Sequence, residues 1–387
     1  MTTTLLHVGR AFTPASELHD AGILLRDGVI EAIGPRSSLT VPAGAREIVA
    51  LDKTAAPGFI DVHIHGAAGH DVMEATEDAL HAISASIGSH GTTSFVATTV
   101  TADPNAICKS SEGIARYIGI QHVKSRPGAE VLGIHFEGPF ISAVRRGVHP
   151  AEWLKLPSAE LLERFVTAAQ GNALLLTIAP ELPGAMPCID AARKSGMVVG
   201  IGHTDATYEQ TRAALAHGAH HAIHTYNAMR PFSHRDAGVI GAVLISPEIS
   251  AELIADGIHV DETSMRLLLQ AKGAGGVILI SDGISATGMP DGNYRLGGFE
   301  VTLSGGVCRN LEGRLAGSTL TLDRALRNIV NLGASLGDAL RMLTVNPATL
   351  LGIEHKKGVL RANADADAVL LNEALEVTQV FTRGLPV

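Results

Sequence analysis

The chain has 387 residues, of which 46% are apolar and 18% are charged, so it can form one large catalytic domain and a smaller module. Its formal net charge is −9 and it has no basic tract, which argues against a nucleic-acid partner. No apolar run approaches the roughly 20 residues that span a bilayer. The start of the chain lacks a secretory pattern, and the three cysteines are far apart with no CxxC motif, so we expect a cytoplasmic protein with reduced thiols.

Strand-like patterns dominate both ends of the chain. Near the start, Asp27-Gly28 separates two β-rich runs, which predicts a hairpin, and a further apolar run covers residues 46–51. The last 34 residues, after position 353, are strand-like again. Terminal strands can pair when the two chain ends lie close together. We therefore expect residues 1–54 and 354–387 to form one small β-sandwich domain.

Between these segments, short apolar runs alternate with helix-like stretches. There are eight such runs, at 58–65, 93–99, 131–138, 173–180, 197–205, 221–228, 251–260 and 276–283. Eight strand–helix units predict an α/β fold, a (β/α)8 barrel of the TIM type over residues 55–353. A segment at about 293–315 has the pattern of a β-hairpin inserted before the last helices.

Side chains that can bind a metal or move a proton follow six of these eight runs. They are His63, His65, Glu137, His203, His224, His259 and Asp282. In a barrel, the ends of all parallel strands meet at the C-terminal face, where active sites are built. Their common position after a strand is the main argument for a site at that face.

The His63-x-His65 pair can bind a metal, because residues i and i+2 of a strand point to the same face. The alternative is that both are polar residues of the barrel interior, each hydrogen-bonded to a neighbour. The other strand-end residues favour a divalent ion, most simply Zn²⁺, although Fe²⁺ or a similar ion accepts the same ligands. Asp282 could instead cap a helix after the eighth strand.

Several motifs carry a family resemblance. DVHIHG, HFEGPF, GHTDA, HTYNAM, ADGIHV and SDG occur in the order seen in the amidohydrolase superfamily. They resemble its N-acetylglucosamine-6-phosphate deacetylase branch from about residue 55 to the end of the chain. Many superfamily members have a carbamylated lysine after the third strand. Glu137 stands at that place here, as it does in the deacetylase branch.

The resemblance implies a role for each strand-end residue. Glu137, His203 and His224 would hold the main metal ion. His63 and His65, with Glu137 as a bridge, would hold a second ion, so that each subunit binds one or two.

The same resemblance implies the proton-transfer groups. Asp282 would be the general base and then the general acid. His149, in GVHP, would donate a hydrogen bond to the carbonyl oxygen as it becomes an oxyanion. The alternative for His149 is an ordinary loop histidine.

The substrate implied by the resemblance is a phosphorylated amino sugar. His259 and Arg235 match phosphate contacts of the family, and Asn227 and Ala228 match residues that hydrogen-bond nearby. In the family the arginine comes from the neighbouring subunit, which implies a homodimer with shared sites. The alternative is that Arg235 is an ordinary solvent-exposed arginine in a loop.

The implied reaction is deacetylation of N-acetylglucosamine 6-phosphate to glucosamine 6-phosphate and acetate, in amino-sugar catabolism and cell-wall recycling. One alternative is a related amidohydrolase that acts on another N-acetylated amino sugar or a cyclic amide. Another is a non-catalytic binding module, which is disfavoured because every expected site position is filled. We expect His70, His90, His220 and His221 to be packing or surface residues rather than ligands.

Overall fold

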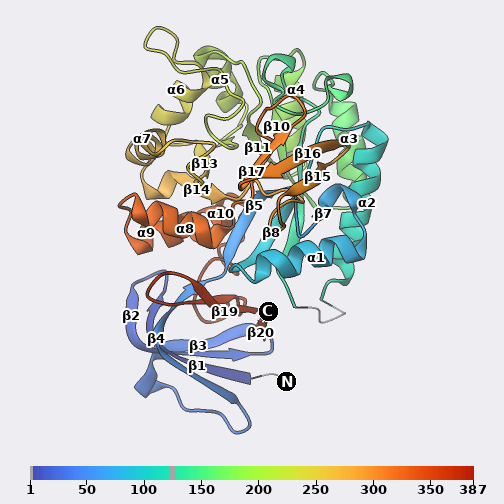
Figure 1. The fold of residues 1–387 in the computed structure, drawn as a ribbon. Coiled ribbons are helices and arrows are strands. Elements are labelled where there is room, and N and C mark those ends of the chain that lie inside the picture. Colours follow the sequence, from blue (N-terminus) through green and yellow to red (C-terminus); the bar gives the residue numbers. More distant parts are fainter. Residues whose placement is uncertain (1–2, 123–126) are drawn as a thin grey trace.

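The computed structural model describes residues 3–122 and 127–387. A large barrel with its helices lies above a small β domain, and both chain termini lie at the small domain (Figure 1). A single strand, β4 (Arg46–Pro57), runs from the small domain toward the first barrel strand. The predicted α/β architecture, with a TIM-type barrel and a small terminal β domain, is therefore confirmed.

The barrel is one sheet of eight parallel strands in the order β14-β13-β12-β11-β10-β9-β8-β5. Each of the eight predicted runs coincides with one of them, although three strands begin one residue before the run. The strands are β5 (Phe59–Ile64), β8 (Thr92–Thr99), β9 (Glu130–Glu137), β10 (Ala173–Ile178), β11 (Val198–Ile201), β12 (His221–Ala222), β13 (Ser250–Ile254) and β14 (Val277–Ile280). The sheet closes where Gly283, just after β14, pairs with Ile64 of β5.

A helix follows each barrel strand and packs on the outside of the sheet (Figure 1). These helices are α1 (Glu77–Gly88), α2 (Pro104–Ile120), α3 (Ala159–Ala168), α4 (Ala185–Lys194), α5 (Tyr208–Ala216), α6 (Gly238–Ile245), α7 (Glu262–Lys272) and α8 (Leu322–Asn331), followed by α9 (Leu336–Leu343) and α10 (Val345–Leu350). Six of them begin at a side chain that accepts a hydrogen bond from the first turn. These caps are Thr76, Asp103, Ser158, Thr207, Asp261 and Ser335. Such caps fix where each helix starts, and so fix the length of the loops at the site.

The small domain is one sheet of seven strands that curls on itself. In sheet order these are β20 (Leu385–Pro386), β19 (Val377–Thr382), β18 (Ala368–Leu371), β4 (Arg46–Pro57), β1 (Thr3–Phe12), β2 (Glu17–Arg26) and β3 (Val29–Pro35). The predicted hairpin joins β2 to β3, with left-handed φ values of 48° at Asp27 and 87° at Gly28. The curl brings β3 back to Asp365, which encloses a separate apolar core.

The insertion near residues 293–315 has one strand more than the predicted hairpin. It is an antiparallel sheet of β15 (Gly292–Leu296), β16 (Phe299–Ser304) and β17 (Val307–Asn310). Its inner side chains, such as Val301 and Leu303, pack with Ile284 after β14 and Val100 after β8. This contact holds the insertion over the C-terminal face of the barrel.

A buried lysine joins the two domains. Lys357 Nζ lies 2.7 Å from Glu130 Oε2, 2.9 Å from Asp365 Oδ2 and 2.8 Å from Asp367 Oδ2. Glu130 begins barrel strand β9, whereas the two aspartates lie just before β18 of the small sheet. The lysine side chain is only 7% exposed. One cation thus bridges carboxylates from both domains.

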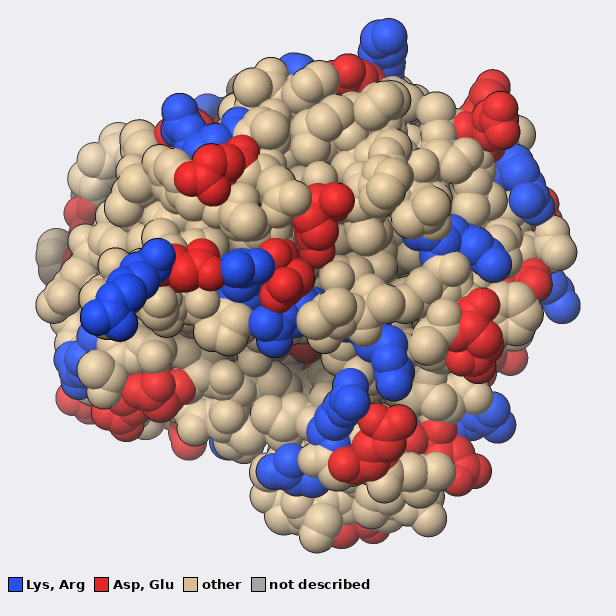
Figure 2. All heavy atoms as spheres, turned by 90° about the horizontal axis from the view of Figure 1, so that it is seen from above, with Lys and Arg blue, Asp and Glu red and all other residues tan. Residues whose placement is uncertain are grey.

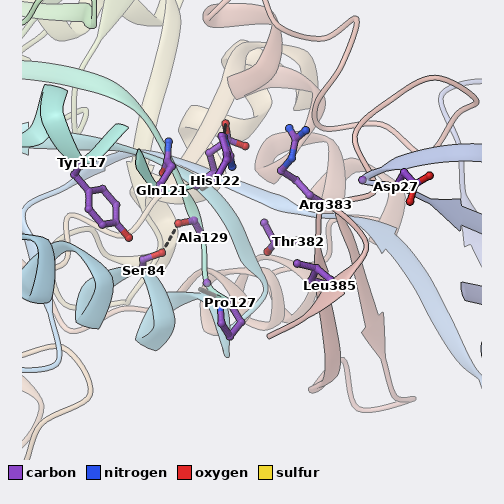
Figure 3. A pocket seen from close by; sticks show the side chains of 13 residues that line it. Asp27, Ser84, Tyr117, Gln121, His122, Pro127, Ala129, Thr382, Arg383 and Leu385 are labelled. Atoms are coloured by element: carbon purple, nitrogen blue, oxygen red, sulfur yellow. Dashed lines mark hydrogen bonds and ion pairs between the residues drawn. The ribbon is translucent and has the colours of Figure 1, made fainter. Parts of the chain in front are cut away.

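A pocket lies beside this junction, at the bottom of the barrel (Figure 3). Asp27 and Arg383 of the small domain lie on one side of it, and Tyr117 of α2 lies on the other. Glu130 also lines it. Because Glu137 ends the strand that Glu130 begins, this pocket lies at the opposite end of β9 from the predicted active site.

Acidic and basic side chains are interspersed on the face of the molecule seen from above (Figure 2). The described residues of that face form no extended basic patch. Within the described residues, no helix is both long and apolar enough to cross a membrane. Cys108, Cys188 and Cys308 are all free.

Candidate active site

Glu137, the last residue of β9, lies at the centre of a cluster of five histidines and is 2% exposed. Its Oε1 atom lies 3.1 Å from His203 Nε2, 3.0 Å from His224 Nε2 and 3.3 Å from His63 Nε2. Its Oε2 atom lies 3.3 Å from Nε2 of both His65 and His149. The structure therefore brings together residues from β5, β9 and the loops after β9, β11 and β12, as the strand-end argument predicts.

The partners of Nδ1 determine what three of these histidines can do. Nδ1 of His63 faces a carboxylate oxygen of Glu252 at 2.9 Å. In His65 it faces the carbonyl oxygen of Thr98 at 2.9 Å, and in His203 that of Arg145 at 3.0 Å. An acceptor beside Nδ1 holds a proton on that nitrogen, so Nε2, which faces Glu137, is the nitrogen that can give up its proton to bind a metal ion. This is the arrangement found in metal-binding histidines.

His149 has the opposite arrangement. Its Nδ1 accepts a hydrogen bond from the backbone N–H of Thr101 at 3.2 Å and lies 2.9 Å from the Thr101 hydroxyl. Nε2 must then carry the proton in the neutral ring, and it points into the site. Burial lowers the pKa of His149 to about 4, despite the nearby Glu137 carboxylate. His149 is thus a neutral hydrogen-bond donor at pH 7.

Asp282 follows β14 and points toward the same cluster. Its Oδ1 atom lies 3.3 Å from His65 Nε2 and 3.7 Å from His63 Nε2. Burial raises its pKa, but the hydrogen bond from His65 and the charge of His63 outweigh burial and leave the pKa below its usual value. The aspartate does not cap a helix, because the next helix, α8, begins forty residues later at Leu322.

Several of the loop residues at the site have left-handed backbone conformations. The φ angles are 46° at His203, 25° at His224, 51° at Ala228 and 50° at Asp282. Such values are uncommon for residues other than glycine and cost of order 1–3 kcal/mol each. These turns thus direct site side chains toward Glu137, and the strained backbone lowers local stability.

An open pocket of about 300 Å³ leads to this cluster. Three predicted substrate-binding residues, Asn227, Ala228 and His259, line it. Arg235 does not line this pocket within its own chain. It is exposed in the loop before α6, where its backbone N–H bonds to the Ser233 hydroxyl. The prediction that Arg235 serves a neighbouring subunit remains untested.

Sequence analysis missed two cations that line the pocket, Arg145 and Arg314. Arg314 follows β17 of the insertion and donates a hydrogen bond to the Gly147 carbonyl at 3.0 Å. Neither follows a barrel strand directly, so the strand-end pattern gave no signal for them.

His259 is held by Asp256 from its own loop. The Asp256 carboxylate accepts a hydrogen bond from the His259 backbone N–H at 2.8 Å and lies 2.7 Å from His259 Nδ1. Burial lowers the pKa of His259, but the hydrogen bond and charge of Asp256 outweigh burial and raise it overall. A positively charged ring at the pocket suits an anionic substrate group.

The other four histidines considered in the sequence lie away from Glu137. His70 lies 3.2 Å from Glu74 and His90 lies 3.4 Å from Asp323, both outside the cluster, and His220 is exposed. His221 is buried. It begins β12 inside the barrel, and its Nε2 lies 2.8 Å from Glu252 Oε1.

The donor set fits a divalent metal. Three groups have ligand atoms within 4.8 Å of one another, namely His63–His65–Asp282, His63–Glu137–His224 and Glu137–His149–His203. The Nε2 atom of His63 is buried and makes no properly aligned hydrogen bond to any described residue. Converging imidazole nitrogens around a buried carboxylate are the ligands that Zn²⁺ and similar ions prefer.

A model of the amidohydrolase family matches residues 54–387. The chain belongs to the amidohydrolase family. It is 39% identical over 365 residues to an N-acetylglucosamine-6-phosphate deacetylase from Lysinibacillus sphaericus, covering 94% of this chain and 92% of that protein. It is 36% identical over 383 residues to an N-acetylgalactosamine-6-phosphate deacetylase from Escherichia coli O157:H7, covering 99% and 98%.

Solved amidohydrolase structures share the whole fold. An aspartate-to-alanine mutant of N-acetyl-D-glucosamine-6-phosphate deacetylase from Mycobacterium smegmatis, in complex with N-acetyl-D-glucosamine 6-phosphate, matches with a TM-score of 0.91 and 34% identity over 100% of this chain and 99% of that one. The deacetylase from Pasteurella multocida matches with a TM-score of 0.92 and 28% identity over 100% and 99%. The predicted resemblance to this amidohydrolase branch is thereby confirmed.

Proposed function

We propose that the chain hydrolyses the acetamide of N-acetylglucosamine 6-phosphate to glucosamine 6-phosphate and acetate. The observation that carries this proposal is the convergence of Glu137, His203 and His224, with Asp282 beside them, at the end of an open pocket. Relatives named as deacetylases of this substrate at 38–39% identity support it.

The proposed cofactor is one or two divalent ions, Zn²⁺ or else Fe²⁺ or a similar ion. Glu137, His203 and His224 would hold the first, and His63 and His65, with Glu137, the second. When bound, such an ion lowers the pKa of a water molecule and polarises the acetamide carbonyl.

Two side chains would then move or stabilise charge during the reaction. Asp282, as a carboxylate, would accept the proton of the attacking water and deliver it to the departing amine, which is a poor leaving group without a proton. His149 would donate its Nε2–H to the carbonyl oxygen as negative charge develops there. His149 suits this role because Thr101 already satisfies Nδ1.

A second candidate is N-acetylgalactosamine 6-phosphate, because a relative that covers 99% of this chain is named for that substrate. Purified protein loaded with Zn²⁺ should be assayed for acetate release from both phosphorylated sugars and from unphosphorylated N-acetylglucosamine. We expect the highest kcat/KM with N-acetylglucosamine 6-phosphate. Equal rates with and without the phosphate would remove the claim of phosphate recognition, and no acetate from any of them would remove the proposed function.

The phosphate preference should fall at alkaline pH. His259 has a raised pKa, so its ring keeps its positive charge above the ordinary value of 6.5 and loses that charge as the pH rises through the raised pKa. The substrate phosphate ionises near pH 6 and stays fully charged above pH 7. We therefore expect the ratio of kcat/KM for the phosphorylated over the unphosphorylated sugar to decrease between neutral and alkaline pH. His259→Asn should lower this ratio at pH 7 and flatten its pH profile; an unchanged profile would contradict the role of His259.

Arg235 is proposed to reach the phosphate in the partner subunit of a homodimer. Loss of a hydrogen bond to a charged group costs about 1.5–3 kcal/mol, so Arg235→Ala should lower kcat/KM by about 10–100-fold. A mixture of Arg235→Ala and Asp282→Asn subunits, dissociated and reassociated, should recover activity because one site of the mixed dimer has both residues. The outcome against shared sites is a mixture no more active than the sum of the two variants.

We also propose that the reaction takes place in the cytoplasm. The three free thiols suit a reducing compartment.

A further inference from the structure

Glu252 is a buried carboxylate that the proposed mechanism does not use. It lies in the middle of β13, inside the barrel, and is 0% exposed. Burial of an ionised carboxylate is costly unless its oxygens are fully hydrogen-bonded. The contacts that satisfy Glu252 should therefore explain why it is there.

Both oxygens of Glu252 face donors from the active-site strands. Oε2 accepts from His63 Nδ1 at 2.9 Å and from the backbone N–H of His224 at 2.9 Å. Oε1 lies 2.8 Å from His221 Nε2, and His221 Nδ1 lies 2.8 Å from the Ser250 hydroxyl. Oε2 of Glu252 thus contacts both His63 and His224. The Nε2 atoms of these two histidines lie 3.3 Å and 3.0 Å from Glu137 Oε1.

The contact with Glu252 fixes the orientation of His63. With a proton of His63 held on Nδ1, Nε2 is the nitrogen that points into the site, 3.3 Å from Glu137 Oε1. His135 packs against the ring of His63 in an edge-on geometry, with 4.8 Å between the ring centroids. The ring is therefore enclosed between a carboxylate and a second imidazole, and it has little room to rotate.

Glu252 also accepts a hydrogen bond from the main chain of His224. His224 has a left-handed φ of 25°, which an L-residue adopts only when its surroundings hold it there. The Glu252 oxygen binds the N–H of this strained residue, while the His224 ring reaches Glu137. Glu252 therefore joins one residue of each proposed ligand group, His63 and His224.

We propose that Glu252 is a positioning residue, which orients His63 toward the second metal ion and fixes it relative to His224. This inference rests on the proposed function, since it concerns the metal site assigned there. Carboxylates that hold the far nitrogen of a ligating histidine contribute about 10–100-fold to metal affinity.

Metal binding by variants at Glu252 tests the proposal. We expect E252A to bind the weaker of two Co²⁺ ions about 10–100-fold less tightly, measured by absorption and by competition with a chelator. E252Q keeps an acceptor oxygen for His63 and His224 and should retain most of the affinity. S250A is the matched control, because it lies on the same strand and contacts His221 but not His63; it should bind Co²⁺ as wild type does.

Two results would overturn the proposal from these variants. One is wild-type Co²⁺ affinity in folded E252A. The other is a loss in folded E252Q as large as in E252A, because the acceptor oxygen would then have no effect.

A measurement on the wild-type protein tests the proposed role of Glu252 even if a variant does not fold. Nitrogen-15 NMR of labelled histidine reports which ring nitrogen of His63 carries a proton. We expect a protonated Nδ1 in both the metal-free and the Zn²⁺-loaded protein. An unprotonated Nδ1 in either form would overturn the proposal.

The same experiments distinguish this inference from the proposed function. If wild type releases acetate but folded E252A keeps full Co²⁺ affinity, the role of Glu252 fails and the function stands. If wild type releases no acetate while Co²⁺ binding depends on Glu252, the function fails and the role of Glu252 stands.

Discussion

Replacement of Asp282 by asparagine should lower kcat by about 10²–10⁴-fold, because the variant cannot accept or deliver the proton that the reaction requires. The substitution keeps the shape of the side chain. Asparagine also tolerates the left-handed backbone at this position, where φ is 50°. Folding and metal content should therefore stay close to those of wild type.

Steady-state acetate release and metal analysis of the same preparation measure this effect. Asp291→Asn makes the identical change in the exposed insertion, where either residue can accept the hydrogen bond from the Gly305 N–H, and it should leave kcat unchanged. Near-normal turnover of the Asp282 variant would mean that a different group serves as the base. Loss of the metal in that variant would instead make Asp282 a ligand.

Replacement of Lys357 by methionine should destabilise the protein by about 3–5 kcal/mol, the usual cost of removing one partner from a buried ion pair. The lysine ammonium contacts Glu130, Asp365 and Asp367, all within 2.9 Å of Nζ. Methionine has a similar length but no charge, so the three carboxylates would be left close together without the lysine between them.

Urea unfolding of the variant at pH 7 measures this loss. Lys356→Met is the control, since the neighbouring lysine is exposed, and its effect should stay within about 0.5 kcal/mol. Equal unfolding midpoints for the two variants would contradict the role of Lys357. The site is distant from this change: Glu130 and Glu137 are seven residues apart on β9, or about 23 Å.

The ion pair between Lys357 and Glu130 should also make the stability of the protein depend on pH. Burial raises the pKa of Glu130, but His122 and Lys357 outweigh burial and lower it from 4.5 to about 2. A lowered folded-state pKa stabilises the fold above pH 4.5, and this contribution is lost as the pH falls toward 2. Lys357→Met should lose much of this acid-dependent component, so its stability should vary less with pH between 5 and 3.

The barrel was predictable because parallel strands that are covered on both faces leave a repeated local signal in the sequence. Six of the eight apolar runs have at their end a side chain that can bind a metal or move a proton, and the strand ends meet at one face whatever the loops between them do. This is why Glu137, His203, His224 and Asp282 could be placed together without coordinates, although they are up to 145 residues apart in the sequence.

Other features depend on contacts that sequence spacing does not encode. Arg314 reaches the pocket only because the insertion folds back over the barrel. Lys357 meets Glu130 only because β18 joins the sheet that begins at the N-terminus. Glu252 did leave a signal, a lone charge within an apolar strand. The strand-end pattern did not include Glu252, because that pattern covers only residues at the end of each run.

The position of β4 in the small sheet has a consequence for synthesis of the chain. Its neighbours are β1, made before it, and β18, made more than three hundred residues later. During translation, the edge of β4 that finally pairs with β18 stays open while the entire barrel leaves the ribosome. Open strand edges invite pairing with other chains. A prematurely terminated product ending before residue 368 would keep that edge exposed and should aggregate.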